Sequence, residues 1–108
     1  MRNAAERRAL VHYLLRGYRI LDTNVWAGGY ELDLVVRRGR TLVFCEVKSR
    51  SRGGFGGPAG AVGPEKRRRI RQAATAWLVA HPECRRLAVR FDVVTELDGR
   101  LRRLPSAF

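Results

Sequence analysis

Apolar and polar residues follow two different periods along the chain, and these periods predict both helices and strands. Residues 4–16 place apolar side chains three and four positions apart, as an amphipathic helix does, and Gly17 is suited to end that helix. Residues 64–80 show the same period, and Pro64 is favoured in the first turn of a helix. The pattern therefore predicts one helix over each of these two ranges.

Strand patterns lie between and after the two helices. Runs rich in branched apolar residues, separated by turn sequences that contain glycine, predict strands over residues 18–24, 31–36, 41–48, 87–95 and 100–104. The order is therefore helix, three strands, helix, two strands. This order predicts an α/β protein with a mixed sheet of about five strands flanked by two helices, and residues 1–108 are expected to form a single domain.

Residues 49–63 have no hydrophobic period. They are rich in glycine and carry Arg50 and Arg52 near their start, which predicts a mobile basic loop. Such a loop either closes over a strand of nucleic acid or is a plain connector between the third strand and the second helix.

The net charge narrows the choice of partner. The chain has 22 Lys and Arg against 10 Asp and Glu, a formal net charge of +12, whereas solubility alone needs a magnitude of only about 2–8. A strongly basic field attracts polyanions, so nucleic acid is the favoured partner. The alternatives are an acidic protein or membrane surface, or solvation alone.

No segment resembles a signal peptide or reaches membrane-spanning length. We therefore expect a cytoplasmic protein with no membrane partner. Two cysteines are too few for a disulfide framework.

Acidic residues gather on two neighbouring predicted strands. Glu31 and Asp33 are two positions apart and so share a face, as do Glu46 and Lys48 on the next strand. A hairpin turn centred on Arg38-Gly39 would place Glu31 opposite Glu46, and Asp33 opposite Phe44. Opposed like charges destabilise a sheet, so this crowding suggests a compensating charge.

A divalent cation is the natural compensating charge, because Mg²⁺ and Mn²⁺ prefer carboxylate oxygens. Lys48 would point at the same space and could stabilise an attacking hydroxide or the charge growing on a phosphate. That set is sufficient for phosphodiester hydrolysis. The alternative is an ordinary solvated ion pair between Glu46 and Lys48.

The spacing of these residues resembles a known motif. Asp33, thirteen residues before Glu46-Val47-Lys48, resembles the bipartite motif of the PD-(D/E)xK nuclease superfamily. The whole chain also looks like the YraN-like family of uncharacterised bacterial proteins. The supporting features are Glu6, Gly17-Tyr18, Glu31-Leu32-Asp33-Leu34, Phe44-Cys45-Glu46-Val47-Lys48-Ser49-Arg50, Lys66, Arg90-Phe91-Asp92-Val93-Val94 and Ala107-Phe108.

The resemblance implies a restriction-endonuclease-like fold, similar to Holliday-junction resolvases. It implies that Asp33 and Glu46 bind Mg²⁺ or Mn²⁺ together with the backbone carbonyl of Val47, and that Lys48 is the catalytic lysine. Under this resemblance, Glu31 is either a further ligand or a neighbour of the ligands. Resolvases of this fold act as dimers, so a homodimer is an open alternative.

The first predicted helix contributes one further candidate. Glu6 would add a carboxylate to the metal site, as the first helix of such folds often does. The chain also departs from the family pattern at one place, because Tyr30 stands where glycine is common before this glutamate. We expect Tyr30 either to narrow access to the site or to stack on a base.

Basic and aromatic residues outside the motif suggest how nucleic acid would be held. Lys66, Arg67 and Arg69 lie at the start of the second predicted helix, where free backbone N–H groups also favour phosphate; the alternative is a solvated helix face. Trp26 is expected at the edge of the core in preference to stacking on a base, and Trp77 is expected in the core.

Together these observations predict a metal-dependent endonuclease that hydrolyses phosphodiester bonds in DNA, including branched or otherwise structured DNA. Two alternatives remain open at this stage. One is a nucleic-acid-binding module without catalysis, whose affinity would fall steeply with salt. The other is a basic interaction protein for an acidic partner.

Overall fold

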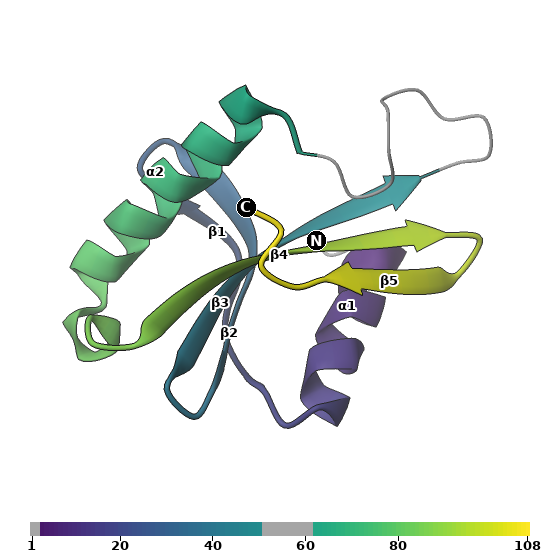
Figure 1. Cartoon of the computed structure of the whole chain (residues 1–108), viewed down its shortest axis with the longest axis horizontal. Helices are drawn as coiled ribbons and strands as arrows, with labels where there is room; N and C mark the ends of the chain where they lie inside the picture. Colours follow the sequence, from purple (N-terminus) through teal and green to yellow (C-terminus); the bar gives the residue numbers. More distant parts are fainter. Residues whose placement is uncertain (1–2, 51–61) are drawn as a thin grey trace.

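The protein has a five-stranded sheet with a helix on each face, as a computed structural model that describes residues 3–50 and 62–108 shows (Figure 1). The predicted α/β class and the order of two helices and five strands are confirmed. The elements in chain order are α1 (Ala4–Leu15), β1 (Arg19–Ala27), β2 (Tyr30–Arg38), β3 (Thr41–Arg50), α2 (Pro64–Ala80), a short 3-10 helix (Pro82–Cys84), β4 (Ala88–Leu97) and β5 (Arg100–Leu104).

The strands lie side by side in sequence order, from β1 to β5. Three neighbouring pairs are antiparallel, whereas β3 and β4 are parallel and are connected through α2. A parallel pair needs a long crossover connection, and a helix is its usual form. The sheet is therefore mixed, as the sequence predicted.

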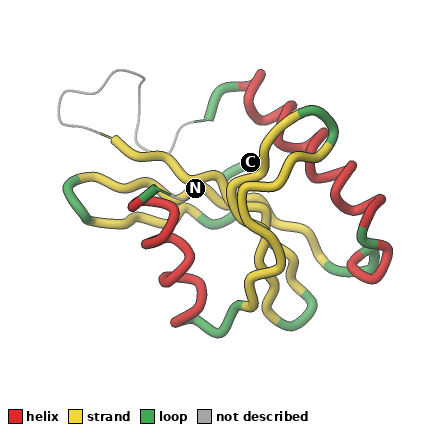
Figure 2. Tube along the Cα trace, turned by 180° about the vertical axis from the view of Figure 1, so that it is seen from behind, coloured by secondary structure: helices red, strands yellow, loops and turns green. Residues whose placement is uncertain are grey.

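Each face of the sheet carries its own apolar core. On one face, Ile70, Ala73 and Trp77 of α2 pack with Val35 and Phe44. On the other face, α1 packs on a second cluster through its buried residues Ala9 and Tyr13. Figure 2 shows the two helices on opposite sides of the strands. Trp77 is thus a core residue, as predicted.

The predicted register between β2 and β3 is wrong by two residues. The observed partners are Leu34 with Cys45 and Val35 with Phe44, and the strands are joined by the two-residue turn Gly39-Arg40. Gly39 has φ +60° and stands first in the turn, which is typical of a type II′ turn. The sequence analysis had placed this glycine second, and a turn shifted by one position changes every cross-strand pair.

Strands β2 and β3 part after this hairpin. Their ladder ends at Leu34 and Cys45, although β1 and β2 remain paired to Ala27 and Tyr30. In the other direction, β3 stays paired with β4 as far as Arg50 and Leu97. The sheet therefore forks, with β1 and β2 running toward α2 and β3 and β4 leading away (Figure 1).

The alternation of β2 breaks at the fork. Leu32 packs in the cluster on the α2 face, although Leu34, two residues on, packs in the cluster on the α1 face. In a regular strand these two side chains would share a face. On the neighbouring strand, Asn24 has the left-handed φ of +47°. The irregularity therefore lies where Asp33 is, between these two leucines.

A second aspartate, Asp92 on β4, ties the α1 face together. Its fully buried carboxylate accepts hydrogen bonds from the Tyr13 hydroxyl (2.8 Å), from Nε of Arg90 (2.8 Å) and from the backbone N–H of Ser106 (3.1 Å). Burying a charge is costly unless it is paired and hydrogen-bonded, and these partners meet that requirement. Asp92 therefore has a structural role.

Strand β3 extends further than predicted. It includes Ser49 and Arg50, so the loop predicted over 49–63 begins too early; residues 51–61 lie outside the described residues. Phe108 stacks on Phe91 with ring centroids 5.1 Å apart, so the C-terminal end packs on the protein's own core. Within residues 3–50 and 62–108, neither helix combines the length and the apolar character needed to cross a membrane.

The tip of the β1–β2 hairpin is fastened to α2, and this contact can be tested with a matched pair of variants. Gly28 and Gly29 both have positive φ, but a Cβ at Gly28 would lie 3.1 Å from Cβ of Ala76, whereas nothing lies within 4 Å of a Cβ at Gly29. We expect Gly29→Ala to lower the free energy of unfolding by about 1 kcal/mol through backbone strain. Gly28→Ala should lower it by about 1–3 kcal/mol more, because it also crowds the helix.

Urea unfolding followed by circular dichroism measures both variants. Equal losses in the two variants would contradict the tight contact between Gly28 and α2.

Candidate functional site

Asp33 and Glu46 face each other where the sheet forks. Continuing the register by one pair from Leu34 and Cys45 brings these two residues opposite one another. Glu46 is only 6% exposed, and Oδ2 of Asp33 accepts a hydrogen bond from the backbone N–H of Val47 at 2.9 Å. The β2–β3 ladder has already ended at this point, so the Asp33 carboxylate takes the place of a strand partner for that N–H group.

Charge crowding strongly affects Asp33. Burial raises the pKa of its carboxyl group, and the nearby Glu46 carboxylate raises it further, to about 7, although the hydrogen bond from Val47 opposes the change. Glu6 adds a smaller contribution in the same direction. A carboxyl group held this way gains from any cation that comes between it and Glu46.

Lys66 supplies a positive charge to the pair from the first turn of α2. Its Nζ lies 2.8 Å from Oε1 of Glu46, and this hydrogen bond raises the pKa of Lys66. The lysine side chain is 57% exposed, so it can leave the carboxylate without unpacking the core. The sequence analysis placed Lys66 among phosphate-binding residues and did not foresee this ion pair.

Asn24 connects the two remaining acidic candidates to the site. Its side-chain amide donates hydrogen bonds to Glu6 of α1 and, at 3.4 Å, to Glu31 of β2. Glu6 is buried and also caps the first turn of α1 through Asn3, whereas Glu31 is exposed. The prediction that Glu31 lies opposite Glu46 is wrong, because the register places Asp33 there.

Lys48 lies two residues after Glu46 on β3 and therefore shares its face by strand alternation. It is half-buried. The predicted catalytic lysine thus lies on the strand and on the face that carry the buried glutamate.

The predicted nucleic-acid-binding residues divide into two groups. Arg69 of α2 lies near the site, with its guanidinium carbon 5.6 Å from the centroid of the Tyr30 ring and an ion pair to Glu65. Arg67 is directed elsewhere, because its Nε donates to the carbonyl of Val62 and its guanidinium lies over Phe108. Arg52 and the side chain of Arg50 lie outside the described residues.

A cavity of about 380 Å³ lies at the carboxylate pair. Its lining residues are Trp26, Tyr30, Glu31, Asp33, Glu46, Lys66, Arg69 and Ile70. Trp26 is 70% exposed, so its predicted place at the edge of the core is wrong. The cavity thus combines carboxylates, cations and aromatic rings.

The donor set can accommodate a hard divalent cation with few protein ligands. Among residues 3–50 and 62–108, no group of three or more His, Cys, Asp or Glu side chains is arranged to hold a metal ion. Mg²⁺, however, is commonly bound by one or two carboxylates together with water and substrate phosphates. Asp33 and Glu46 meet that smaller requirement, and their mutual repulsion favours a cation between them.

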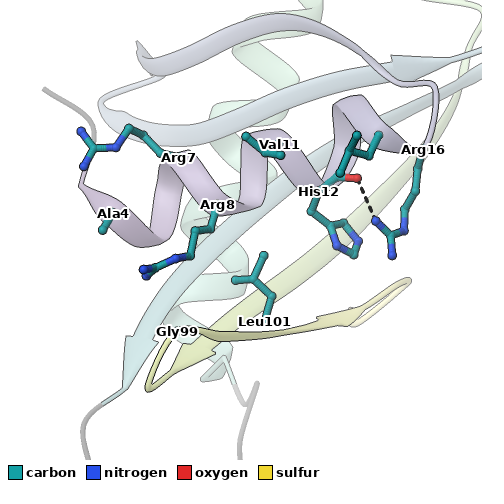
Figure 3. A pocket seen from close by; sticks show the side chains of 9 residues that line it. Ala4, Arg7, Arg8, Val11, His12, Arg16, Gly99 and Leu101 are labelled. Atoms are coloured by element: carbon teal, nitrogen blue, oxygen red, sulfur yellow. Dashed lines mark hydrogen bonds between the residues drawn. The ribbon is translucent and has the colours of Figure 1, made fainter.

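A larger cavity, of about 510 Å³, lies between α1 and the β4–β5 hairpin (Figure 3). Its described lining is basic and apolar, and no acidic residue contributes to it; Nη1 of Arg16 there donates to the carbonyl of His12 at 3.1 Å. His12 is the one described residue of this lining that can act as a base or metal ligand, and its neighbours there are arginines and apolar side chains. The carboxylate pair, and with it the candidate site, lies in the smaller cavity.

Sequence reasoning missed Asn24 and assigned Trp26 to the wrong environment. Asn is one of the few residues other than glycine that adopts positive φ readily, so an Asn within a predicted strand was a usable signal of an irregularity. No comparable signal distinguishes an exposed tryptophan from a buried one in a strand of mixed polarity.

Fold and site together define an α/β protein with a carboxylate pair, half-buried Asp33 and buried Glu46, and adjoining cations at a fork in a mixed sheet. The model of the uncharacterised protein family UPF0102 matches residues 5–95, and the chain belongs to this family. A UPF0102 protein of Methylorubrum extorquens (strain PA1) is 43% identical over 97% of this chain and 81% of its own length. One of Anaeromyxobacter dehalogenans (strain 2CP-C) is 47% identical over 86% of this chain and 72% of its own length.

The raised pKa of Asp33 predicts how stability depends on pH when divalent cations are absent. The folded protein retains a proton on Asp33 up to about pH 7, whereas the unfolded chain loses it near the ordinary value of 3.8. The free energy of unfolding should therefore fall as the pH rises through this window. Asp33→Asn should gain stability relative to the wild type by more than about 1 kcal/mol between about pH 5 and pH 8.

Urea unfolding in EDTA at several pH values measures this difference. Glu83→Gln, which changes an exposed glutamate after α2, is the control and should leave the pH dependence as in the wild type. Parallel curves for Asp33→Asn and the wild type would contradict the crowding of the two carboxylates.

Proposed function

We propose that this protein is a metal-dependent endonuclease that hydrolyses phosphodiester bonds in DNA and belongs to the PD-(D/E)xK nuclease superfamily. The observation that carries the proposal is the pairing of Asp33 with Glu46 in a cavity that also holds Lys66 and Arg69. The resemblance of Asp33 and Glu46-Val47-Lys48 to the motif of that superfamily supports it, as does the formal net charge of +12.

Mg²⁺ or Mn²⁺ is the cofactor in this proposal. Asp33 and Glu46 would hold the ion, with the carbonyl of Val47 as the backbone ligand. Glu6 and Glu31, which both accept hydrogen bonds from Asn24, would add negative charge near the ion. When bound, such an ion polarises the phosphodiester and lowers the pKa of a water molecule. A cation fits between these carboxylates because it would relieve the crowding that raises the pKa of Asp33, namely burial and the charge of Glu46.

The basic residues near the carboxylate pair would act on the substrate. Lys48 shares the face of Glu46, so its ammonium group would stabilise the charge that grows on the phosphate. Lys66 and Arg69, from the first two turns of α2, would bind neighbouring phosphates. Lys66 would exchange its contact with Glu46 for one with the nucleic-acid backbone.

A second candidate function is a nucleic-acid-binding module without catalysis. The ion pair between Lys66 and Glu46 favours it, because Lys66 already neutralises one carboxylate without a metal ion. In that case the charge pair would be a structural feature of the fork, and binding would depend on the basic surface alone.

Cleavage and metal binding, measured on the same variants, test the nuclease. Labelled linear duplex, single-stranded, flap and four-way-junction DNA is incubated with the protein in Mn²⁺, Mg²⁺ or EDTA, and Mn²⁺ binding is followed by calorimetry. We expect metal-dependent cleavage that Asp33→Asn and Glu46→Gln abolish together with metal binding. Lys48→Met should retain metal binding and lower the cleavage rate about 100-fold or more.

Glu83→Gln is the matched control, because it removes an exposed carboxylate at the opposite end of α2 from Lys66. It should leave both metal binding and cleavage unchanged. DNA binding that is equal in the wild type and in all variants, without cleavage in either metal, would overturn the nuclease and favour the binding module.

A further inference from the structure

Trp26 is exposed to an unusual degree for its type. Its exposed fraction is 70%, whereas Trp77 is only 2% exposed. Tryptophan is highly buried on average, so the exposure of Trp26 at a cavity that is also lined by cations calls for an explanation. Trp26 lies near the end of β1, opposite Glu31 of β2, so a regular part of the sheet holds its backbone.

Trp26 and Tyr30 line the cavity that contains the carboxylate pair. The same cavity, of about 380 Å³, is lined by Asp33, Glu46 and Lys66. Flat aromatic rings thus share one cavity with cations that can hold a phosphate. A nucleotide has this combination of groups, namely a planar base and an anionic phosphate, and proteins that bind single strands use aromatic stacking and basic grooves in the same way.

The hairpin that carries the two aromatic residues is fastened to α2. At the hairpin that joins Trp26 to Tyr30, Nε2 of Gln72 donates to the carbonyl of Gly28 at 3.0 Å. Arg69 lies over the Tyr30 ring at 5.6 Å. Both contacts come from α2, the helix that also presents Lys66 to Glu46. The hairpin that carries the rings is therefore held against the helix that carries Lys66 and Arg69.

We propose that Trp26 and Tyr30 form a binding site for an unpaired nucleobase beside the carboxylate pair. In an intact duplex the bases are stacked and paired, so their faces cannot reach these rings unless a base is flipped out. The substrate class is therefore nucleic acid with an unpaired nucleotide, such as a single strand, a flap or a branch. The position of this site beside a cleavage centre rests on the proposed function, but base binding itself does not.

The net charge and the neighbouring cations favour nucleic acid over an apolar protein segment as the occupant. The formal net charge is +12, and Lys66 and Arg69 border the rings. A purely apolar partner would gain nothing from these cations, whereas the phosphates next to an unpaired base would gain from both.

Binding measured in EDTA tests this site without cleavage. Single-stranded oligothymidine, a blunt duplex of equal length and an oligouridine are titrated into the protein, and tryptophan fluorescence and oligonucleotide anisotropy are recorded. We expect the single strand to quench Trp26. Trp26→Ala should weaken single-strand binding about 10-fold, and Trp26→Phe should restore most of it, because stacking needs an aromatic face. Duplex binding should change less than about twofold, because it depends on phosphate contacts.

Val79→Ala is the matched control, since Val79 is an exposed apolar residue of α2 that is 79% exposed and does not line this cavity. It should leave all three affinities unchanged. Equal losses of single-strand and duplex binding in Trp26→Ala, or no loss of either, would overturn the base site. Absence of oligonucleotide binding would also overturn it. Preference for oligouridine would support the base site and identify RNA as the substrate.

The two proposals fail in distinguishable ways. Selective single-strand binding through Trp26, without cleavage in any metal, keeps the base site and removes the nuclease. Metal-dependent cleavage that Trp26→Ala leaves unchanged keeps the nuclease and removes the base site.

Discussion

The separation of β2 from β3 is the constraint on which the rest of the site depends. A backbone N–H group that loses its strand partner in a partly buried position needs another acceptor, and at Val47 that acceptor is the Asp33 carboxylate. This contact fixes Asp33 at the fork, directly across from Glu46. Helix α2 holds the β1–β2 hairpin through the contact of Gln72 with Gly28. The β3–β4 pairing continues on the other side of the fork.

Two aspartates in the same sheet show why only one of them is a functional candidate. Asp92 is surrounded by donors and cations, with Tyr13, Arg90 and a backbone N–H group all directed at its oxygens. Its charge is fully compensated inside the protein. Asp33 receives one backbone hydrogen bond and faces a second carboxylate. The protein leaves that charge partly uncompensated, so an external cation has something to stabilise.

Local sequence determines the elements of this fold, but it does not determine how they meet. The periods of 4–16 and 64–80 predicted both helices because the hydrogen bonds of a helix are local, and the run over 41–48 predicted β3 because a short continuous apolar run is typical of a buried strand. The β2–β3 register depended on the position of one glycine in a two-residue turn. The pairing of Asp33 with Glu46, and not with Phe44, therefore came from the structure.

The contacts of Lys66 and Trp26 could not be predicted because they are tertiary. Lys66 meets Glu46 across about twenty residues of chain, part of which lies outside the described residues. Trp26 could have been covered by a helix, and its exposure follows from where α2 happens to cross the hairpin. Sequence identified Asp33, Glu46 and Lys48 as candidates. The fork, the cavity and the position of Trp26 and Tyr30 in its lining are properties of the folded chain.

The mixed charge of the cavity has a consequence for how a polyanion can enter it. Two carboxylates repel phosphate, so an overall charge of +12 would draw a polyanion to the surface but would not by itself bring a phosphate to Asp33 and Glu46. Lys66 now offsets one of the two carboxylates. If Lys66 turns to a phosphate, the carboxylate pair loses that compensation at the moment the anion arrives. Close approach of a phosphate and binding of a cation would therefore be coupled, since each removes the electrostatic cost that opposes the other.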